Sequence, residues 1–367
     1  MTAPRKAPTL RELGWTPELE EAFKPHALRG LIPGRIIAEH RMACDLVCAR
    51  GEFTAEVSGN FRKAAGSKAG FPAVGDWAAV AFDPAARRQT IQALLPRRTR
   101  LSRKDPGGES EQVIAANIDT VFIVIGLDAT YNLQRVERYL AAVRAGGAEA
   151  IVLLNKADLA EDAAAKVEEI NSLGFGSAAL ALDSVHLKGY EALAAHLGPA
   201  RTIVFAGSSG AGKSTIINNL LGRSAQRTAA VREADSKGRH TTTGRRMFVL
   251  PGSGALLIDT PGMRGLELWA GERTVDETFE DIQALAAQCR FDNCSHSNEP
   301  GCAVRAALDS GELGRAHYAN YLKIREEASL LKARMEIAER LKRKAKNKRP
   351  AEAPKNNIPR HKRGGRR

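Results

Sequence analysis

Residues 204–215, VFAGSSGAGKST, constrain the fold more than any other part of the chain. An apolar run leads into a glycine-rich turn and then into a helical segment, which is the setting of a phosphate-binding loop. Gly207, four further residues, Gly212, Lys213 and Ser214 match the spacing of that loop in full. Glycine is needed because backbone N–H groups must converge on a phosphate, and the following helix adds the positive end of its dipole.

The loop predicts a set of phosphate and magnesium contacts. Lys213 would reach the β- and γ-phosphates, and the Ser214 hydroxyl would ligate Mg²⁺. Asp259 ends the apolar run ALLID and opens the motif DTPG, so its carboxylate would reach the same ion through water. The Gly262 N–H would sense the γ-phosphate. The predicted loop contacts are Gly207, Ser208, Ser209, Gly210, Ala211, Gly212, Lys213, Ser214 and Thr215.

A second motif predicts which base is bound. Asn155, Lys156 and Asp158 follow the apolar run EAIVLL. The Asp158 carboxylate can accept N1–H and N2–H₂ of guanine, whereas adenine would leave this charged acceptor unpaired. Asn155 can brace the loop, and the stem of Lys156 can stack on the base. An isolated surface NKxD would mean little, but beside a phosphate loop and DTPG it predicts GTP rather than ATP.

The pattern of apolar, polar and turn residues along the chain predicts a multidomain α/β protein. Five short β-type runs separated by Gly, Pro and charged turns fit an OB-type barrel, and alternating strand and helix patterns then predict a mostly parallel, helix-covered sheet. A charged helix is expected over residues 318–344. The predicted parts are an N-terminal extension (1–30), an OB-fold RNA-binding domain (31–105), a nucleotide-binding domain (110–283), a helical zinc-binding domain (284–340) and a basic disordered tail (341–367).

Positive charge marks two candidate RNA contacts. The tail holds twelve Lys and Arg residues and one acid, Glu352, so it is either a solvated tail or an arm that neutralises nucleic-acid phosphates; we favour the arm. Basic residues also interleave with aromatic ones in the barrel region. The aromatic rings suit a barrel core, while basic loops on such a barrel commonly hold RNA. The best candidates are Arg97, Arg98, Arg100, Arg103 and Lys104.

A short Cys/His cluster predicts a metal site. Cys289, Cys294, His296 and Cys302 supply four ligands, which as a Cys₃His set would hold one structural zinc ion with no open position. Reduced thiols beside an incidental histidine are the alternative. The first residues have no apolar core of a secretion signal, and no apolar run reaches the length of a membrane span. We therefore expect a cytoplasmic monomer without membrane contact.

Together these motifs resemble a known family. Asn155–Asp158 precede the phosphate loop, which precedes GRHTTT and then DTPG, the order of a circularly permuted GTPase. With VGDWAAV, NLQRVERYL and the zinc cluster, residues 30–325 resemble the small-ribosomal-subunit-dependent GTPases of the RsgA/YjeQ family. The resemblance implies GTP hydrolysis to GDP and phosphate on the 30S subunit, contact with 16S rRNA, and help in late subunit maturation. The family's base-cradling Ser-Ala appears here as Asp183-Ser184, which places Ser184 near the base.

The sequence also suggests how hydrolysis works. Met263 stands directly after DTPG, where many GTPases carry a glutamine that orients the attacking water, so the isolated enzyme should be slow. Thr241 or Thr242 is the expected switch I threonine. His240, beside them, is our candidate for the missing group in the family-like interpretation, and a solvent-exposed loop histidine is the alternative. Two other functions remain open: a nucleotide-gated RNA-binding switch with timer-like hydrolysis, and an ATP-driven remodeller, against which NKAD argues.

Overall fold

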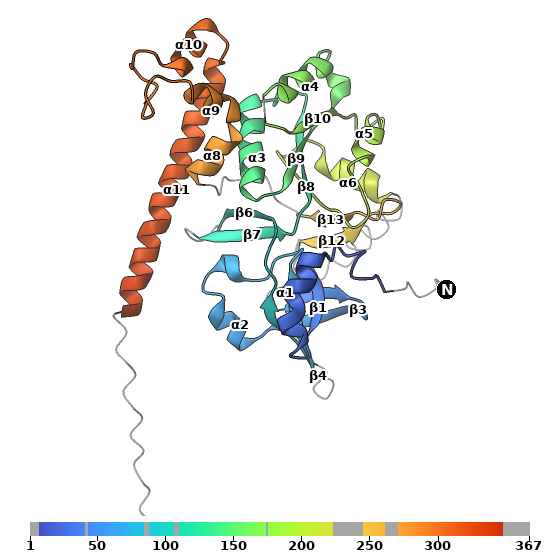
Figure 1. Ribbon diagram of the computed structural model, residues 1–367. Helices are drawn as coiled ribbons and strands as arrows, with labels where there is room; N and C mark the ends of the chain where they lie inside the picture. The colour runs from blue at the N-terminus through green and yellow to red at the C-terminus, as the bar shows by residue number, and fades with distance from the viewer. Residues whose placement is uncertain are drawn as a thin grey trace, which may run out of the picture.

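A computed structural model describes residues 7–40, 43–83, 88–105, 110–173, 175–222, 245–260 and 271–347. A β-barrel lies below a sheet domain with helices on its faces, and a helical part flanks the sheet domain (Figure 1). Among the helices in these ranges, none combines the length and the apolar character that crossing a membrane requires.

Five strands form the barrel, as the sequence predicts; their pairings are antiparallel except for the parallel pair β3–β5. They pair in the order β1-β2-β3-β5-β4, and a further pairing of β4 with β1 closes the ring. Ile36, Leu46 and Val80 are fully buried because alternate residues of these strands point into the barrel, whereas Trp77 faces the other way and packs on Trp15. Helix α1 (Pro17–Ala27) precedes the barrel, and α2 (Gly59–Ala64) and η1 (Lys68–Gly70) lie between its third and fourth strands. The strands are β1 (Ile32–Glu39), β2 (Ala43–Cys48), β3 (Gly51–Val57), β4 (Trp77–Asp83) and β5 (Arg88–Leu94).

A separate ribbon follows the barrel. Strand β6 (Arg100–Lys104) pairs antiparallel with β7 (Glu111–Ala116) and with no strand of the barrel among the described residues. The ribbon therefore connects the barrel to the sheet domain, and the predicted basic run 97–104 lies along this connection rather than on a barrel strand.

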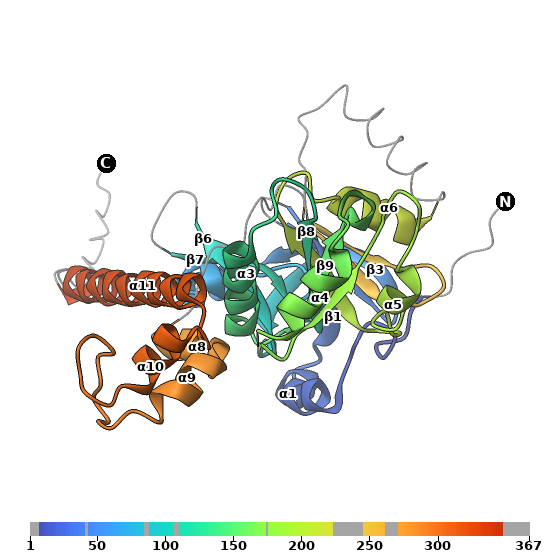
Figure 2. The ribbon, with the colours of Figure 1, turned by 90° about the horizontal axis from the view of Figure 1, so that it is seen from above.

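The sheet domain confirms the predicted parallel, helix-covered architecture. Strands β10, β9, β8, β11 and β13 are parallel in that order, and β12 pairs antiparallel with β13. Helices cover both faces (Figure 2), and the apolar strand β8 is buried throughout its length because it is central. The bounds are β8 (Thr120–Gly126), α3 (Leu133–Ala145), β9 (Glu149–Asn155), η2 (Ala157–Leu159), α4 (Ala163–Asn171), β10 (Ala178–Ala181), α5 (Tyr190–Ala194), β11 (Thr202–Gly207), α6 (Lys213–Leu221), β12 (Arg246–Val249) and β13 (Leu256–Asp259).

One strand joins the sheet domain to the barrel. Arg246 of β12 is the register partner of Asp259 in β13 and of Ala38 in β1. The two domains consequently share one continuous sheet of eleven strands.

The helical part packs on α3. It consists of α8 (Glu272–Thr278), α9 (Glu280–Ala286), α10 (Ala303–Ser310) and the long α11 (Arg315–Asn347). Figure 1 shows α11 running as a rod past the ribbon to the level of the barrel. The helix continues to Asn347, so its last residues enter the segment that the sequence assigns to the basic tail; residues 348–367 are outside the described part.

Candidate nucleotide and metal sites

The glycine-rich loop joins β11 to α6 as the sequence predicts. Gly207 ends β11, and Gly212 caps α6, whose first residue is Lys213. Gly207, Gly210 and Gly212 have φ angles of 139°, 79° and 96°, a region that side chains disfavour. A Cβ on Gly207 would also lie 2.1 Å from the carbonyl oxygen of Val124. The loop thus requires glycine both for its backbone conformation and for the close approach to β8.

Lys213 closes on the loop itself. Its ammonium group donates to the carbonyl oxygens of Gly207 at 2.9 Å and Ser208 at 2.6 Å, and burial lowers the pKa of the lysine. Ser214, in the first turn of α6, is exposed. A phosphate placed before this helix would therefore meet a lysine already confined over the loop and backbone N–H groups at the positive end of the helix.

Asn155 connects the predicted base-reading motif to the phosphate loop. The side chain is fully buried at the end of β9; its amide donates to the carbonyl of Ala211 at 2.8 Å, and its oxygen accepts the Ser184 N–H at 3.1 Å. A Cβ on Gly212 would lie 2.1 Å from the Asn155 amide nitrogen. Asn155 thus holds three separate segments together, and Ser184 is buried beside it.

Lys156 and Asp158 lie just beyond this junction. Lys156 has a left-handed backbone (φ 62°), and its ammonium is 2.6 Å from a carboxylate oxygen of Asp128, whose pKa it holds well below the usual range. Ligand atoms of Asp158, Asp183 and His186 all lie within 4.8 Å of one another. Sequence reasoning missed Asp128 and His186. Asp128 follows the carboxyl end of a buried strand, and ligands bind at the carboxyl ends of parallel strands, so its position in the sequence could have marked it as a site residue.

The magnesium side is only partly described. Asp259 ends β13, beside the strand that carries the phosphate loop. The predicted contacts Gly262, His240, Thr241 and Thr242 lie outside the described residues.

The four predicted cysteine and histidine ligands converge. The ligand atoms of Cys289, Cys294, His296 and Cys302 all lie within 4.8 Å of one another, and this set could hold a metal ion. The sulfurs of Cys289 and Cys302 are 3.9 Å apart, far beyond a disulfide bond, and all five cysteines of the chain, which fall in its described part, are free thiols. The cluster lies in the loop between α9 and α10.

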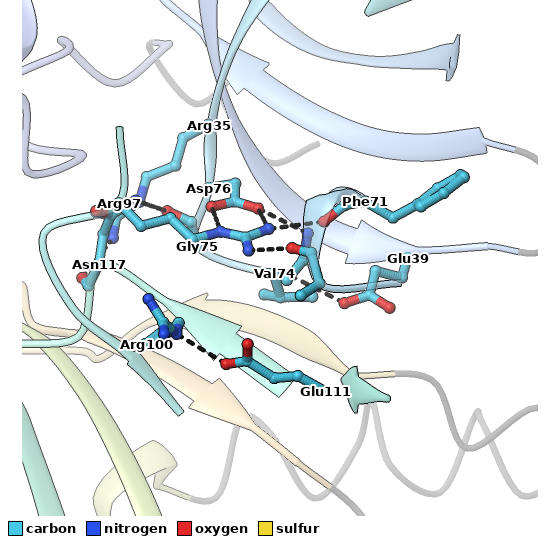
Figure 3. A network of polar contacts seen from close by, with 12 residues as sticks. Arg35, Glu39, Phe71, Val74, Gly75, Asp76, Arg97, Arg100, Glu111 and Asn117 are labelled. Carbon is cyan, nitrogen blue, oxygen red and sulfur yellow. Dashed lines mark hydrogen bonds and ion pairs between the residues drawn. The ribbon is translucent and has the colours of Figure 1, made fainter. Parts of the chain in front are cut away.

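The predicted RNA-contacting arginines have different environments. Arg97 forms two hydrogen bonds, of 2.8 and 2.7 Å, to the fully buried carboxylate of Asp76, and it also donates to the carbonyls of Ala69 and Phe71 (Figure 3). Its guanidinium is therefore engaged in hydrogen bonds inside the protein. The remaining contacts are Arg98 with Asp119, Arg100 with Glu111 at 2.8 Å and Arg103 with Gln112 at 3.0 Å, while the side chain of Lys104 is not described.

Comparison with known proteins supplies the family. A family model described as "RsgA GTPase" matches residues 94–269. A protein of Opitutus terrae named "Small ribosomal subunit biogenesis GTPase RsgA" is 46% identical over 338 residues, which cover 89% of this chain and 92% of that protein. The chain belongs to the RsgA GTPase family.

Two solved structures agree with this assignment. The crystal structure of YjeQ from Thermotoga maritima is 24% identical and covers 81% of this chain and 98% of its own, with a TM-score of 0.60, which supports the fold. A structure described as YloQ, a circularly permuted GTPase, is 25% identical and covers 82% and 95% of the two chains, with a TM-score of 0.57. The RsgA-family assignment explains why the base-reading motif precedes the phosphate loop: the chain is a circularly permuted GTPase.

Proposed function

We propose that this RsgA-family GTPase binds the small (30S) ribosomal subunit, hydrolyses GTP faster when bound, and assists late maturation of that subunit. The observation that carries the proposal is the junction at Asn155, which joins the predicted guanine-reading motif to the glycine-rich loop. The printed name of the Opitutus terrae relative supports the small subunit as the partner. We further propose that the protein acts as a monomer in the cytoplasm.

The geometry supports assigned roles in binding GTP. Lys213 would exchange its two carbonyl contacts for phosphate oxygens, and the loop N–H groups of residues 207–215 would hold the β-phosphate. The Asp158 carboxylate would read guanine, with Ser184 near the base and Lys156 stacking over it. The Ser214 hydroxyl and Asp259 would hold Mg²⁺, which neutralises charge that develops on the phosphates. His240, with Thr241 or Thr242, is proposed to complete the hydrolytic site, with Gly262 sensing the γ-phosphate.

The ligand geometry supports zinc as the ion of the cysteine cluster. Tetrahedral zinc, with Zn–S of about 2.3 Å and Zn–N of about 2.0–2.1 Å, separates two thiolates by about 3.8 Å and a thiolate from an imidazole nitrogen by about 3.6 Å. The two sulfurs of Cys289 and Cys302 are 3.9 Å apart, and they lie 3.6 and 3.5 Å from Nδ1 of His296. Such a site stabilises a loop that has few apolar residues.

An RNA-binding surface is proposed along the connecting ribbon. Arg98 and Arg100 expose about half or more of their side chains, although each is paired with a carboxylate, and Arg103 donates to the side-chain amide oxygen of Gln112. With Lys104 and the basic tail they would neutralise phosphates of 16S rRNA.

The decisive experiment compares partners. GTP turnover is measured with purified small subunits, large subunits and bulk RNA at matched salt. Stimulation by small subunits alone supports the proposal. Equal stimulation by bulk RNA would instead favour a nucleotide-gated switch acting on other RNA, and preference for ATP in competition would contradict the guanine assignment.

A further inference from the structure

The structure contains a side-chain link between the barrel and the strand that enters the nucleotide site. Arg245 is the first described residue after the segment that contains His240, Thr241 and Thr242. Its guanidinium Nη1 lies 3.4 Å from a carboxylate oxygen of Glu39, the last residue of β1. The two residues are separated by 206 positions in the chain.

Both members of the pair are confined. The other oxygen of Glu39 accepts the Val74 N–H at 3.0 Å, and Figure 3 shows Glu39 reaching toward the Val74–Asp76 loop. The side chains of Arg245 and Glu39 are 16% and 27% exposed. Burial raises the pKa of Glu39 and lowers that of Arg245, so water screens the attraction less than at the surface. A single carboxylate thus fixes both the barrel loop and the residue that precedes β12.

The loop that Glu39 holds is itself tied to the ribbon that connects the barrel to the sheet domain. The carbonyl of Val74 accepts the Ala116 N–H at 2.9 Å, and Gly75 (φ 95°) approaches so closely that a Cβ would lie 2.1 Å from the Ala116 carbonyl. Asp76 in turn anchors Arg97. The sequence motif VGDWAAV therefore forms a packed junction, and Glu39 is its connection to Arg245.

Arg245 also lies next to the magnesium side of the nucleotide site. The following residue, Arg246, is the register partner of Asp259 across the β12–β13 pair and of Ala38 across the β12–β1 pair. A displacement of the barrel relative to the sheet must therefore act on the start of β12, one residue from the partner of Asp259. The predicted switch threonines are only three and four residues upstream of Arg245.

We propose that the Arg245–Glu39 pair is a positioning device that transmits docking of the barrel to the hydrolytic site of this GTPase. The proposal rests on the function proposed above, since it assigns the route by which the small subunit accelerates hydrolysis. The barrel, when it binds RNA, holds Glu39 in place. Glu39 then holds Arg245, and Arg245 fixes the start of β12, where Arg246 is the register partner of Asp259. Neither residue belongs to the predicted nucleotide and magnesium contacts, so each is proposed as a positioning residue and not a catalytic one.

The test separates intrinsic from stimulated turnover. E39Q keeps an acceptor for Val74 but removes the charge, R245M removes the guanidinium, and R245K restores a positive charge. E149Q is the matched control, because Glu149, the first residue of β9, forms an ion pair of 2.7 Å with Arg201 away from β1 and β12. The measurements are intrinsic turnover, turnover at saturating small subunits, the Kd for a fluorescent GDP analogue, and small-subunit affinity with GDP and with a non-hydrolysable GTP analogue.

E39Q and R245M should lower stimulated turnover at least fivefold while intrinsic turnover and nucleotide Kd change less than twofold. The preference of small subunits for the GTP-analogue form should fall toward one, R245K should recover much of the stimulation, and E149Q should resemble the wild type. Wild-type stimulation in folded E39Q and R245M, or an equal fall in intrinsic and stimulated turnover, would overturn the positioning role. If the wild type itself is not stimulated by small subunits, the proposed function fails first, and the positioning role fails with it.

Discussion

The side-chain amide of Asn155 donates a hydrogen bond of 2.8 Å to the backbone carbonyl of Ala211, which ties the predicted base-reading motif to the glycine-rich loop. The two motifs are 56 positions apart in the sequence. Their order along the chain is therefore unimportant to the site, because parallel strands β9, β8 and β11 bring their carboxyl ends to one edge of the sheet.

Replacement of Asn155 tests this tie. N155A leaves the Ala211 carbonyl and the Ser184 N–H without their buried partner, which should cost about 1–3 kcal/mol of free energy in the arrangement of the two loops. GTP affinity should therefore fall roughly tenfold or more, since each 1.4 kcal/mol of binding free energy corresponds to about a tenfold change in Kd. Titration with a fluorescently labelled GTP measures it. N171A is the control. The side chain of Asn171, the last residue of α4, accepts the N–H of Ala179 in β10, away from the predicted nucleotide site. Its loss should leave the GTP affinity within twofold of the wild type. Wild-type affinity for N155A would contradict the role of the junction.

Two glycines of one loop should respond differently to a methyl group. A Cβ on Gly212 would lie 2.1 Å from the Asn155 amide nitrogen, whereas a Cβ on Gly210 meets no atom within 4 Å. G212A should abolish measurable GTP binding by displacing Asn155. G210A has the same unfavourable positive φ but no clash, so it should retain binding with a loss of about 1 kcal/mol. Calorimetric titration of both variants checks this, and equal affinities would show that the clash has no effect on the site.

Arg97 and Arg103 lie close in the sequence but should act on different properties. R97A leaves the buried Asp76 carboxylate uncompensated, which should destabilise the barrel by about 3–5 kcal/mol in urea unfolding. R103A removes a 3.0 Å hydrogen bond to the neutral side chain of Gln112, so the free energy of unfolding should stay within about 0.5 kcal/mol of the wild type. If Arg103 contacts a phosphate, R103A should reduce the slope of log affinity against log salt for rRNA by about 1. An unchanged slope would remove Arg103 from the RNA surface.

Loss of metal should affect the helical part selectively. The purified protein should contain one zinc ion per chain by elemental analysis, and C294S should lose it together with the protease resistance of residues 287–302. C48S is the control, since Cys48 is a buried barrel cysteine, far from the cluster in the sequence, whose sulfur accepts the Arg50 N–H at 3.3 Å. Full zinc content in C294S would contradict the assigned ligand set.

Local patterns in the sequence predicted the parts of the site that depend on short spacings. The phosphate loop, the NKxD motif and the cysteine cluster each lie within fewer than about fifteen residues, so residue type and spacing determine their geometry. Strand and helix periodicity likewise predicted the barrel and the parallel sheet. The Glu39–Arg245 contact, by contrast, joins residues 206 positions apart, and periodicity does not specify which side chains meet when two domains pack.

The same limit applies to Arg97. Its charge and its neighbours Arg98 and Arg100 predict an RNA contact. Composition alone does not reveal that the Arg97 guanidinium is hydrogen-bonded to the buried carboxylate of Asp76. Asp128 and His186 were missed for a related reason: each acquires a role only when the loops at the carboxyl ends of the strands come together.

A histidine that joins three helices should make stability depend on pH. His317 of α11 lies 2.6 Å from Glu137 of α3 and 2.9 Å from Asp281 of α9 (ring nitrogen to carboxylate oxygen). Burial alone would lower its pKa, but the hydrogen bonds to Asp281 and Glu137 outweigh burial and raise the pKa to about 9. Because this folded-state pKa exceeds the usual value near 6.5, the stabilisation is full below about pH 6.5 and is lost as pH rises through 9.

The expected size is about 3 kcal/mol between pH 6 and pH 10, since one pKa unit corresponds to about 1.4 kcal/mol. Urea unfolding of the wild type and of H317Q at both pH values measures it as the difference between the two proteins. H317Q should already be destabilised at pH 6 and should lose little more at pH 10, whereas H196Q, altered after α5 in the sheet domain, should follow the wild type. If the wild type and H317Q change in parallel with pH, the histidine is not charged in the folded protein, and the three helices must be held together by the packing of Phe175 and Phe279 around it.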